Sequence, residues 1–130
     1  MHFFHVAPES PIPIFEQIVT QVIYGVASGA LEVGTLIPSV RELAIELTVH
    51  PNTVAKAYQE LERRNVLVPR RGRGMEVTAD APGICKSKRQ EIVRNRVRQA
   101  LKEAVQSELP ATEVEKLVLE ELHRCNGHRS

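Results

Sequence analysis

The stretch "PSVRELAIELTVHPNTVAKAYQELERRNVLVPRRGRGMEV", residues 38–77, contains two short amphipathic helix patterns separated by a tight turn. In the first pattern, Ser39 followed by Glu42 is the signature of a capping box, and the apolar residues after it recur at helical spacing. In the second pattern, Pro51 suits the first position of a helix, and Asn65 can adopt the left-handed conformation that ends one. Two helices joined in this way predict a helix-turn-helix.

The end of the same stretch predicts a β-hairpin. The β-prone triplets "VLV" (66–68) and "MEV" (75–77) flank the segment "PRRGRG" (69–74). Gly72 and Gly74 can supply the positive backbone dihedrals of the turn, and three arginines concentrate positive charge there. A hairpin that directly follows the second helix makes the winged form of a helix-turn-helix.

A further helix is expected before this stretch. The segment "PIFEQIVTQVIYGVASG" (13–29) opens with a proline and carries apolar residues in a wide i, i+4 stripe. Gly29 is expected to end this helix. The segment "ALEVGTLI" (30–37) contains turn signals and is expected to be a short connection.

Two helices are expected after the hairpin. A linker should begin at "DAPG" (80–83), followed by a long helix over 86–109 with one apolar edge and a basic side. Pro110 then breaks the pattern, and 111–125 forms a last amphipathic helix. The expected fold is mostly α with a small β-hairpin. A winged helix-turn-helix DNA-binding domain should span 1–80, and a two-helix dimerisation region should span 81–130.

The composition fits a folded protein with an aliphatic core. The 130 residues are 42% hydrophobic and only 4% aromatic, which favours helices packed on helices. Residues 1–80 carry seven basic and nine acidic side chains, a net charge of −2, whereas 81–130 carry ten and seven, a net charge of +3. If the first part binds DNA, it must therefore do so through local clusters of charge rather than a global field. The sequence shows no signal peptide and no membrane-spanning run, so a cytoplasmic location away from membranes is expected.

The second helix of the motif is the one that enters the major groove, and its first turn reaches the base edges. There Asn52 can bridge adenine and Thr53 can contact a base or a phosphate, and Lys56, one turn later on the same side, can reach guanine acceptors. Each alone is an ordinary helix-start or surface residue, but together with the arginine-rich turn they indicate DNA binding. The candidate DNA-binding residues are Ser39, Arg41, His50, Asn52, Thr53, Lys56, Arg70, Arg71, Gly72 and Arg73.

The apolar edges of the last two helices need a partner, because two helices alone can hardly bury them. A homodimer would place two recognition helices on the half-sites of a palindromic double-stranded DNA operator, about one helical turn apart. The candidate dimerisation residues are Val93, Val97, Leu101, Val105, Val114, Leu117, Val118 and Leu122.

Residues 11–78 resemble the N-terminal domain of GntR-type bacterial transcription regulators, with "PSVRELA", "NTVAKAY" and "RRGRG" in order. By this resemblance Arg41 matches a DNA-contacting arginine, Asn52 and Thr53 match recognition-helix contacts, and Arg71 and Gly72 match a wing tip that enters the minor groove. Several positions depart from the family pattern, among them "GMEV" (74–77), which replaces a more usual aromatic-bearing strand. Thr48 and Asn65 stand where glycine is common, and His50 stands where a small polar residue or Asn is common.

The remaining fifty or so residues are too few for the large effector domains of most GntR subfamilies. A short two-helix tail resembles the YtrA subfamily. By that resemblance the tail dimerises the chain, and the usual targets include operons for membrane transporters. The leading hypothesis is a homodimeric, sequence-specific DNA-binding repressor.

Other function classes have weaker support. An enzyme would need a nucleophile, a base or a metal cluster, and the only metal-like grouping is His123, Cys125 and His128 near the end of the chain, with spacing unlike that of zinc sites. No cofactor or metal is therefore expected. A non-specific nucleic-acid-binding or architectural protein using the RG-rich wing is the alternative. The sequence leaves open whether a small-molecule effector binds, and which operator and genes are the targets.

Overall fold

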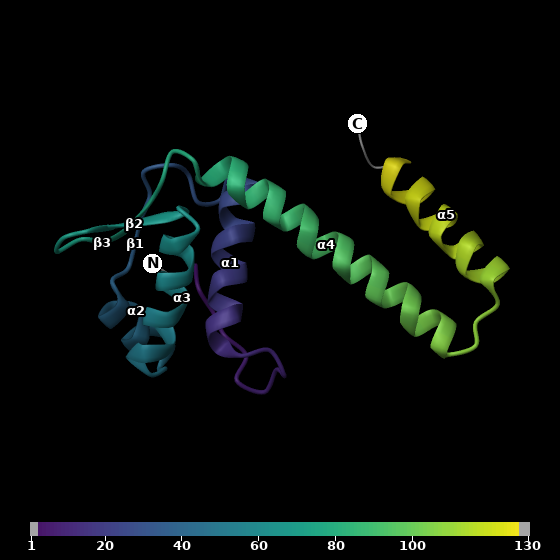
Figure 1. Ribbon diagram of the computed structural model, residues 1–130, viewed down its shortest axis with the longest axis horizontal. Coiled ribbons are helices and arrows are strands. Elements are labelled where there is room, and N and C mark those ends of the chain that lie inside the picture. Colours follow the sequence, from purple (N-terminus) through teal and green to yellow (C-terminus); the bar gives the residue numbers. More distant parts are fainter. Residues whose placement is uncertain (1–2, 128–130) are drawn as a thin grey trace. The chain divides into compact units, whose positions relative to one another are not determined.

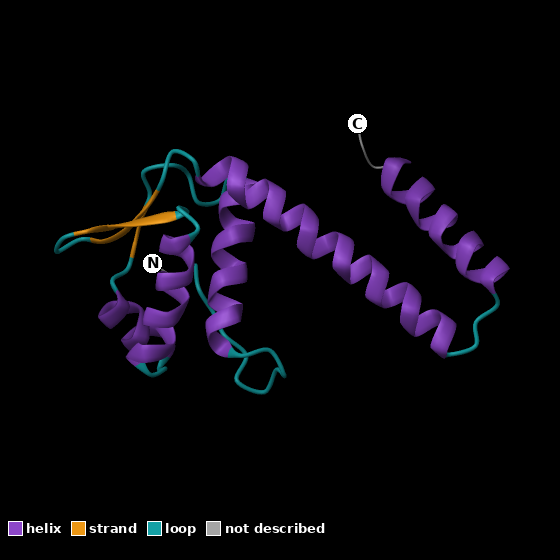
Figure 2. Ribbon diagram, viewed as in Figure 1, coloured by secondary structure: helices purple, strands orange, loops and turns teal. Residues whose placement is uncertain are grey.

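The computed structural model describes residues 3–127, and its elements follow the expected order with one addition (Figures 1 and 2). Five helices and three short strands form in these residues: α1 (Ile14–Ser28), β1 (Leu36–Ile37), α2 (Val40–Leu47), α3 (Pro51–Arg63), β2 (Leu67–Arg70), β3 (Gly74–Val77), α4 (Ala81–Gln106) and α5 (Ala111–Gly127). The fold class is therefore confirmed as mostly helical, with a winged helix-turn-helix followed by two helices.

The expected signals bound the first three helices. Gly29 ends α1 in the left-handed conformation at φ 87°. Ser39 caps α2 with the full capping box, and Pro51 is the first residue of α3. Asn65 lies just beyond the end of α3 at φ 61°. These features depend on neighbouring residues only, which is why the sequence shows them.

The sheet has three strands, and the segment expected to be only a connection supplies the third. β3 lies between β2 and β1 and pairs antiparallel with both. In β1, Leu36 faces Glu76 and Ile37 faces Met75. A two-residue strand has no periodicity, and its partner lies about forty residues further along the chain. The pairing is therefore invisible to a local pattern.

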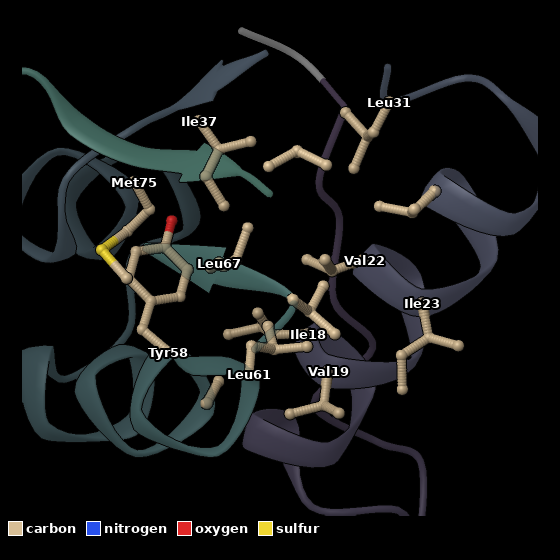
Figure 3. Packing of buried hydrophobic residues seen from close by; sticks show 14 of the residues in the cluster. Ile18, Val19, Val22, Ile23, Leu31, Ile37, Tyr58, Leu61, Leu67 and Met75 are labelled. Atoms are coloured by element: carbon tan, nitrogen blue, oxygen red, sulfur yellow. The ribbon is translucent and has the colours of Figure 1, made fainter. Parts of the chain in front are cut away.

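The core lies between α1, α3 and the sheet (Figure 3). Ile18 and Val22 of α1 are fully buried, as are Leu61 of α3 and Ile37 of β1. Aliphatic side chains dominate this core, as the low aromatic content predicts. Burying each large aliphatic side chain contributes about 1.5–3 kcal/mol before entropy is counted.

α4 begins earlier than the sequence suggests. The expected linker at 80–83 is wrong, because the helix starts at Ala81 with Pro82 and Gly83 in its first turn. Ala81 and Cys85 are both fully buried in the core, so tertiary packing holds this turn in place. Proline is tolerated there because the first amides of a helix have no helical acceptor.

The chain forms two compact units, residues 1–90 and residues 91–130. The first unit contains α1, α2, α3, the sheet and the start of α4. The second contains the rest of α4 together with α5, and no residue of α5 is buried.

Candidate nucleic-acid interface

The N-terminus of α2 is built by reciprocal hydrogen bonds between Ser39 and Glu42. The Glu42 amide donates to Ser39 Oγ at 3.2 Å, and the Ser39 amide donates to Glu42 Oε1 at 3.1 Å. Hydrogen bonds from the Ser39 backbone, and then from the Ser39 side chain, hold the pKa of the Glu42 carboxyl below its usual range. Ser39 is half-buried and Arg41 is exposed in the same first turn.

The turn between α2 and α3 uses Thr48 in the left-handed conformation that glycine usually adopts. Its φ is 55° and its ψ is 50°, and its amide donates to the Ile45 carbonyl at 3.3 Å. Val49 follows with its amide bonded to the Ala44 carbonyl at 3.0 Å. The turn therefore forms without glycine, at the steric cost of a β-branched residue at positive φ.

His50 is the N-cap of α3, a role the sequence analysis missed. Its Nδ1 accepts a hydrogen bond from the Asn52 amide at 3.0 Å. With Nδ1 occupied by this hydrogen bond, Nε2 is the ring nitrogen left for another partner. His50 is exposed, so this nitrogen lies at the surface at the start of the recognition helix. Its position just before Pro51 was the signal available in the sequence.

The first turn of α3 brings two of the expected contacts together, and a third, one turn later, lies against another helix. Asn52 is exposed and Thr53 is half-buried at the start of the helix. Lys56 is exposed, but its ammonium lies 3.9 Å from the centre of the Phe15 ring of α1. A cation over an aromatic face is attracted by the ring quadrupole. Phe15, which belongs to the apolar stripe expected over residues 13–29, therefore also contacts the recognition helix.

Within residues 3–127, one of the three wing arginines pairs with a carboxylate, and the other two do not. Arg70 lies in β2 and pairs with Glu76 of β3 at 2.9 Å. This contact raises the pKa of Arg70 and lowers the pKa of Glu76. Arg71 and Arg73 lie in the turn itself, and neither meets a carboxylate among residues 3–127.

The turn between these strands has the geometry expected of its glycines. Gly72 sits at φ 75° with open space around its Cα, and the Arg73 amide donates to the Arg70 carbonyl at 2.9 Å. Arg71, Gly72 and Arg73 are all exposed, so the tip presents two unpaired guanidinium groups on a short backbone turn.

The expected dimerisation residues lie on the surface of the described chain. On α4, Val93, Val97, Leu101 and Val105 are exposed by 38 to 71% at successive i, i+4 positions. On α5, Leu117, Val118 and Leu122 are exposed and Val114 is half-buried. Large aliphatic side chains in a continuous row at this exposure are typical of an interaction surface.

Two other features bear on function. In residues 3–127 no helix is both long and apolar enough to cross a membrane. The same residues contain no group of three or more His, Cys, Asp and Glu side chains that could hold a metal ion. His128, part of the metal-like grouping in the sequence, lies outside the described residues.

A capped α2, a tight turn, an α3 that starts with exposed polar residues, and a basic wing together define a winged helix-turn-helix DNA-binding domain. The family model described as "Bacterial regulatory proteins, gntR family" matches residues 14–77. The chain is also 34% identical to the HTH-type transcriptional repressor YtrA of Bacillus subtilis over 110 residues, which cover 85% of this chain and 82% of that protein. The chain therefore belongs to the gntR family and is a DNA-binding transcription regulator rather than an enzyme.

Solved structures agree with this assignment. A transcriptional regulator from Oenococcus oeni superposes with a TM-score of 0.71 at 31% identity, covering 90% of this chain and 97% of the other. YtrA from Sulfolobus acidocaldarius, described as a GntR-family transcription factor, superposes with a TM-score of 0.56 at 33% identity, covering 75% and 95%. Both matches cover more of this chain than residues 14–77, which the family model matches.

Proposed function

We propose that the chain is a repressor that binds an inverted-repeat operator as a homodimer in the cytoplasm. The observation that carries this proposal is the continuous exposed aliphatic row on α4, accompanied by a second one on α5. A chain with a single recognition helix reads one half-site, and joining two copies by their tails gives the two-fold symmetry that an inverted repeat requires. The similarity to a relative described as a repressor supports the direction of regulation.

In each copy, Asn52 and Thr53 are proposed to meet base edges or phosphates in the major groove. Arg71 and Arg73 at the wing tip are proposed to contact the minor groove and the adjacent phosphates. Arg41 and Ser39, at the start of α2, are proposed to contact the sugar–phosphate backbone of the DNA. These groups are exposed or half-buried and all belong to one compact unit.

The decisive experiment is selection of bound fragments from the source genome with the purified full-length chain, at stated salt and with excess competitor DNA. We expect an enriched motif with two-fold symmetry and half-sites about one helical turn apart. The genes beside the enriched fragments test whether a transporter operon is controlled. If competitor DNA displaces every fragment equally, the chain binds without sequence preference and acts as an architectural protein.

A further inference from the structure

A row of three positive side chains runs along α4 beside its apolar edge. Arg94, Arg98 and Lys102 follow one another at i, i+4 spacing, and all three are exposed. Within residues 3–127 none of the three pairs with a carboxylate; Arg98 donates only to Asn95 Oδ1, at 3.1 Å. Like charges at this spacing repel each other within a helix. Repulsion among these three charges therefore destabilises the helix in the isolated chain, and an acidic partner would reduce that repulsion.

A surface with more negative than positive side chains lies around the start of α5. A hollow of about 220 Å³ is lined by three aliphatic and three charged side chains, namely Leu109, Val114, Leu117, Glu113, Lys116 and Glu120. Lys116 pairs with Glu120 at 4.0 Å, so two carboxylates and one ammonium leave the lining with one net negative charge. Glu113 and Glu120 are seven residues apart, so both lie on the same side of the helix. This hollow combines aliphatic lining with two carboxylates on one side.

We infer that these two surfaces meet between two copies of the chain, so that the α4 edge of one copy docks on the α5 hollow of the other. Val97 and Leu101 would cover the aliphatic part of the hollow. Arg98 and Lys102 would lie opposite the partner copy's acidic side. This inference rests on the proposed homodimer and adds to it which surfaces pair and what selects the pairing.

Two observations favour a second copy over DNA as the partner of the basic row. The row runs directly beside exposed Val97 and Leu101, and contact with phosphates gives those side chains nothing to pack on. The chain also carries the complementary acidic hollow itself, so two-fold symmetry would use both surfaces twice. Charges at such a rim act mainly on partner choice and association, which makes the pairing open to charge exchange.

The test uses three full-length variants and the wild type in sedimentation velocity at low salt. Arg98→Glu/Lys102→Glu reverses the row, and Glu113→Lys/Glu120→Lys reverses the hollow. Each alone should weaken dimerisation about tenfold, because attraction becomes repulsion, and an equimolar mixture of the two should restore a heterodimer of near wild-type strength. Gln99→Glu/Gln106→Glu is the control. Gln99 lies two positions from Val97 and Leu101, on the opposite side of α4, so this variant should dimerise like the wild type.

The outcomes separate the two proposals. If the wild type is monomeric at micromolar concentration, the proposed homodimer is contradicted. A dimeric wild type, with both reversed variants dimerising equally well, would overturn only the pairing of these surfaces. A row reversal that leaves the dimer intact and flattens the salt dependence of DNA binding would also overturn it and assign the row to phosphates. Circular dichroism of each variant shows that α4 and α5 remain helical.

Discussion

At the residue scale, Gly74 decides how closely the wing packs on the rest of the domain. It begins β3 at φ 104°, and a Cβ at this position would lie 2.2 Å from the Ile37 carbonyl oxygen of β1. Gly72, two residues earlier, has a similar positive φ of 75° but open space around it. A side chain at Gly72 would meet only backbone strain, whereas a side chain at Gly74 would meet both strain and a steric clash.

We expect Gly74→Ala to destabilise the domain by more than about 3 kcal/mol, because strain at positive φ adds to a clash with backbone that cannot move cheaply. Gly72→Ala should cost only about 1 kcal/mol, since it carries the strain alone. Urea unfolding of both variants measures the difference. Equal losses of stability would show that β1 moves aside and that the close approach is not a constraint.

Lys56 is the second residue whose role depends on a single contact. Its ammonium lies over the Phe15 ring, which is half-buried on α1. The ring thus holds the lysine beside the first turn of α3, where we propose the DNA contacts.

If the ring positions Lys56 for DNA, Phe15→Leu should weaken operator binding about two- to fivefold, the size of an exposed cation–π contact. Phe15→Tyr keeps the ring and should bind like the wild type. Combined with Lys56→Ala, the leucine variant should show no further loss, and fluorescence anisotropy measures the cycle. Tighter binding by Phe15→Leu would mean instead that Lys56 must leave the ring to reach DNA.

At the element scale, α2 depends on its capping box and the wing depends on its cross-strand ion pair. Both are local devices in which one charged side chain is held by a neighbour. The capping box should make stability depend on pH, and the ion pair should change how DNA binding depends on salt.

Because the pKa of Glu42 is lowered in the folded state, its contribution to stability is present above the unfolded value, near 4.5, and is lost as pH falls through the folded value. Wild type should therefore be more stable than Glu42→Gln at pH 6, and the gap should close in acid. Ser39→Ala removes the other half of the box and should cost about 1 kcal/mol at pH 6. Thermal unfolding at several pH values tests this, and a gap that does not narrow at all as the pH is lowered would contradict it.

The wing arginines should differ in their effect on DNA binding. Arg71→Ala removes an unpaired charge and should lower affinity and reduce the salt slope of binding by about one. Arg70→Ala removes a charge that Glu76 already balances at 2.9 Å, so its effect on the slope should be smaller. Affinities measured across a salt series decide the point. An equal slope change for both variants would show that DNA displaces Glu76 from Arg70.

At the scale of the whole molecule, the buried core is contained in one of the two compact units. Its buried members run from Phe4 to Cys85, within residues 1–90, whereas α5 contributes none. Cys85 is fully buried, and burial raises the pKa of its thiol to about 11. The thiol therefore stays protonated and covered near neutral pH.

A fragment of residues 1–90 should fold by itself and protect Cys85 from alkylation at pH 8 until it is unfolded. It should be monomeric and should bind an inverted-repeat operator at least about a hundredfold more weakly than the full chain, because the link between two recognition helices is lost. Mass spectrometry after alkylation and anisotropy titration measure the two effects. Rapid labelling of Cys85 in the fragment would show that residues 91–130 stabilise the winged domain.

The sequence by itself determined the three helices of the winged domain, the capping box of α2, and the hairpin with its glycines. Those features depend on residues within one or two turns of each other, as with Ser39 and Glu42 or with Gly29 after α1. The same locality made the exposed polar start of α3 and the apolar edges of the tail recognisable. The family resemblance followed from these local motifs and is confirmed by the chain's relatives.

Only the tertiary structure decided the contacts that join distant segments. β1 pairs with β3 across about forty residues, and Phe15 meets Lys56 across a similar distance. Packing of Ala81 and Cys85 into the core turned an expected linker into the first turn of α4. The ion pair between Arg70 and Glu76 depends on the register in which β2 and β3 pair. Such contacts arise from chain packing, which a local sequence pattern does not encode.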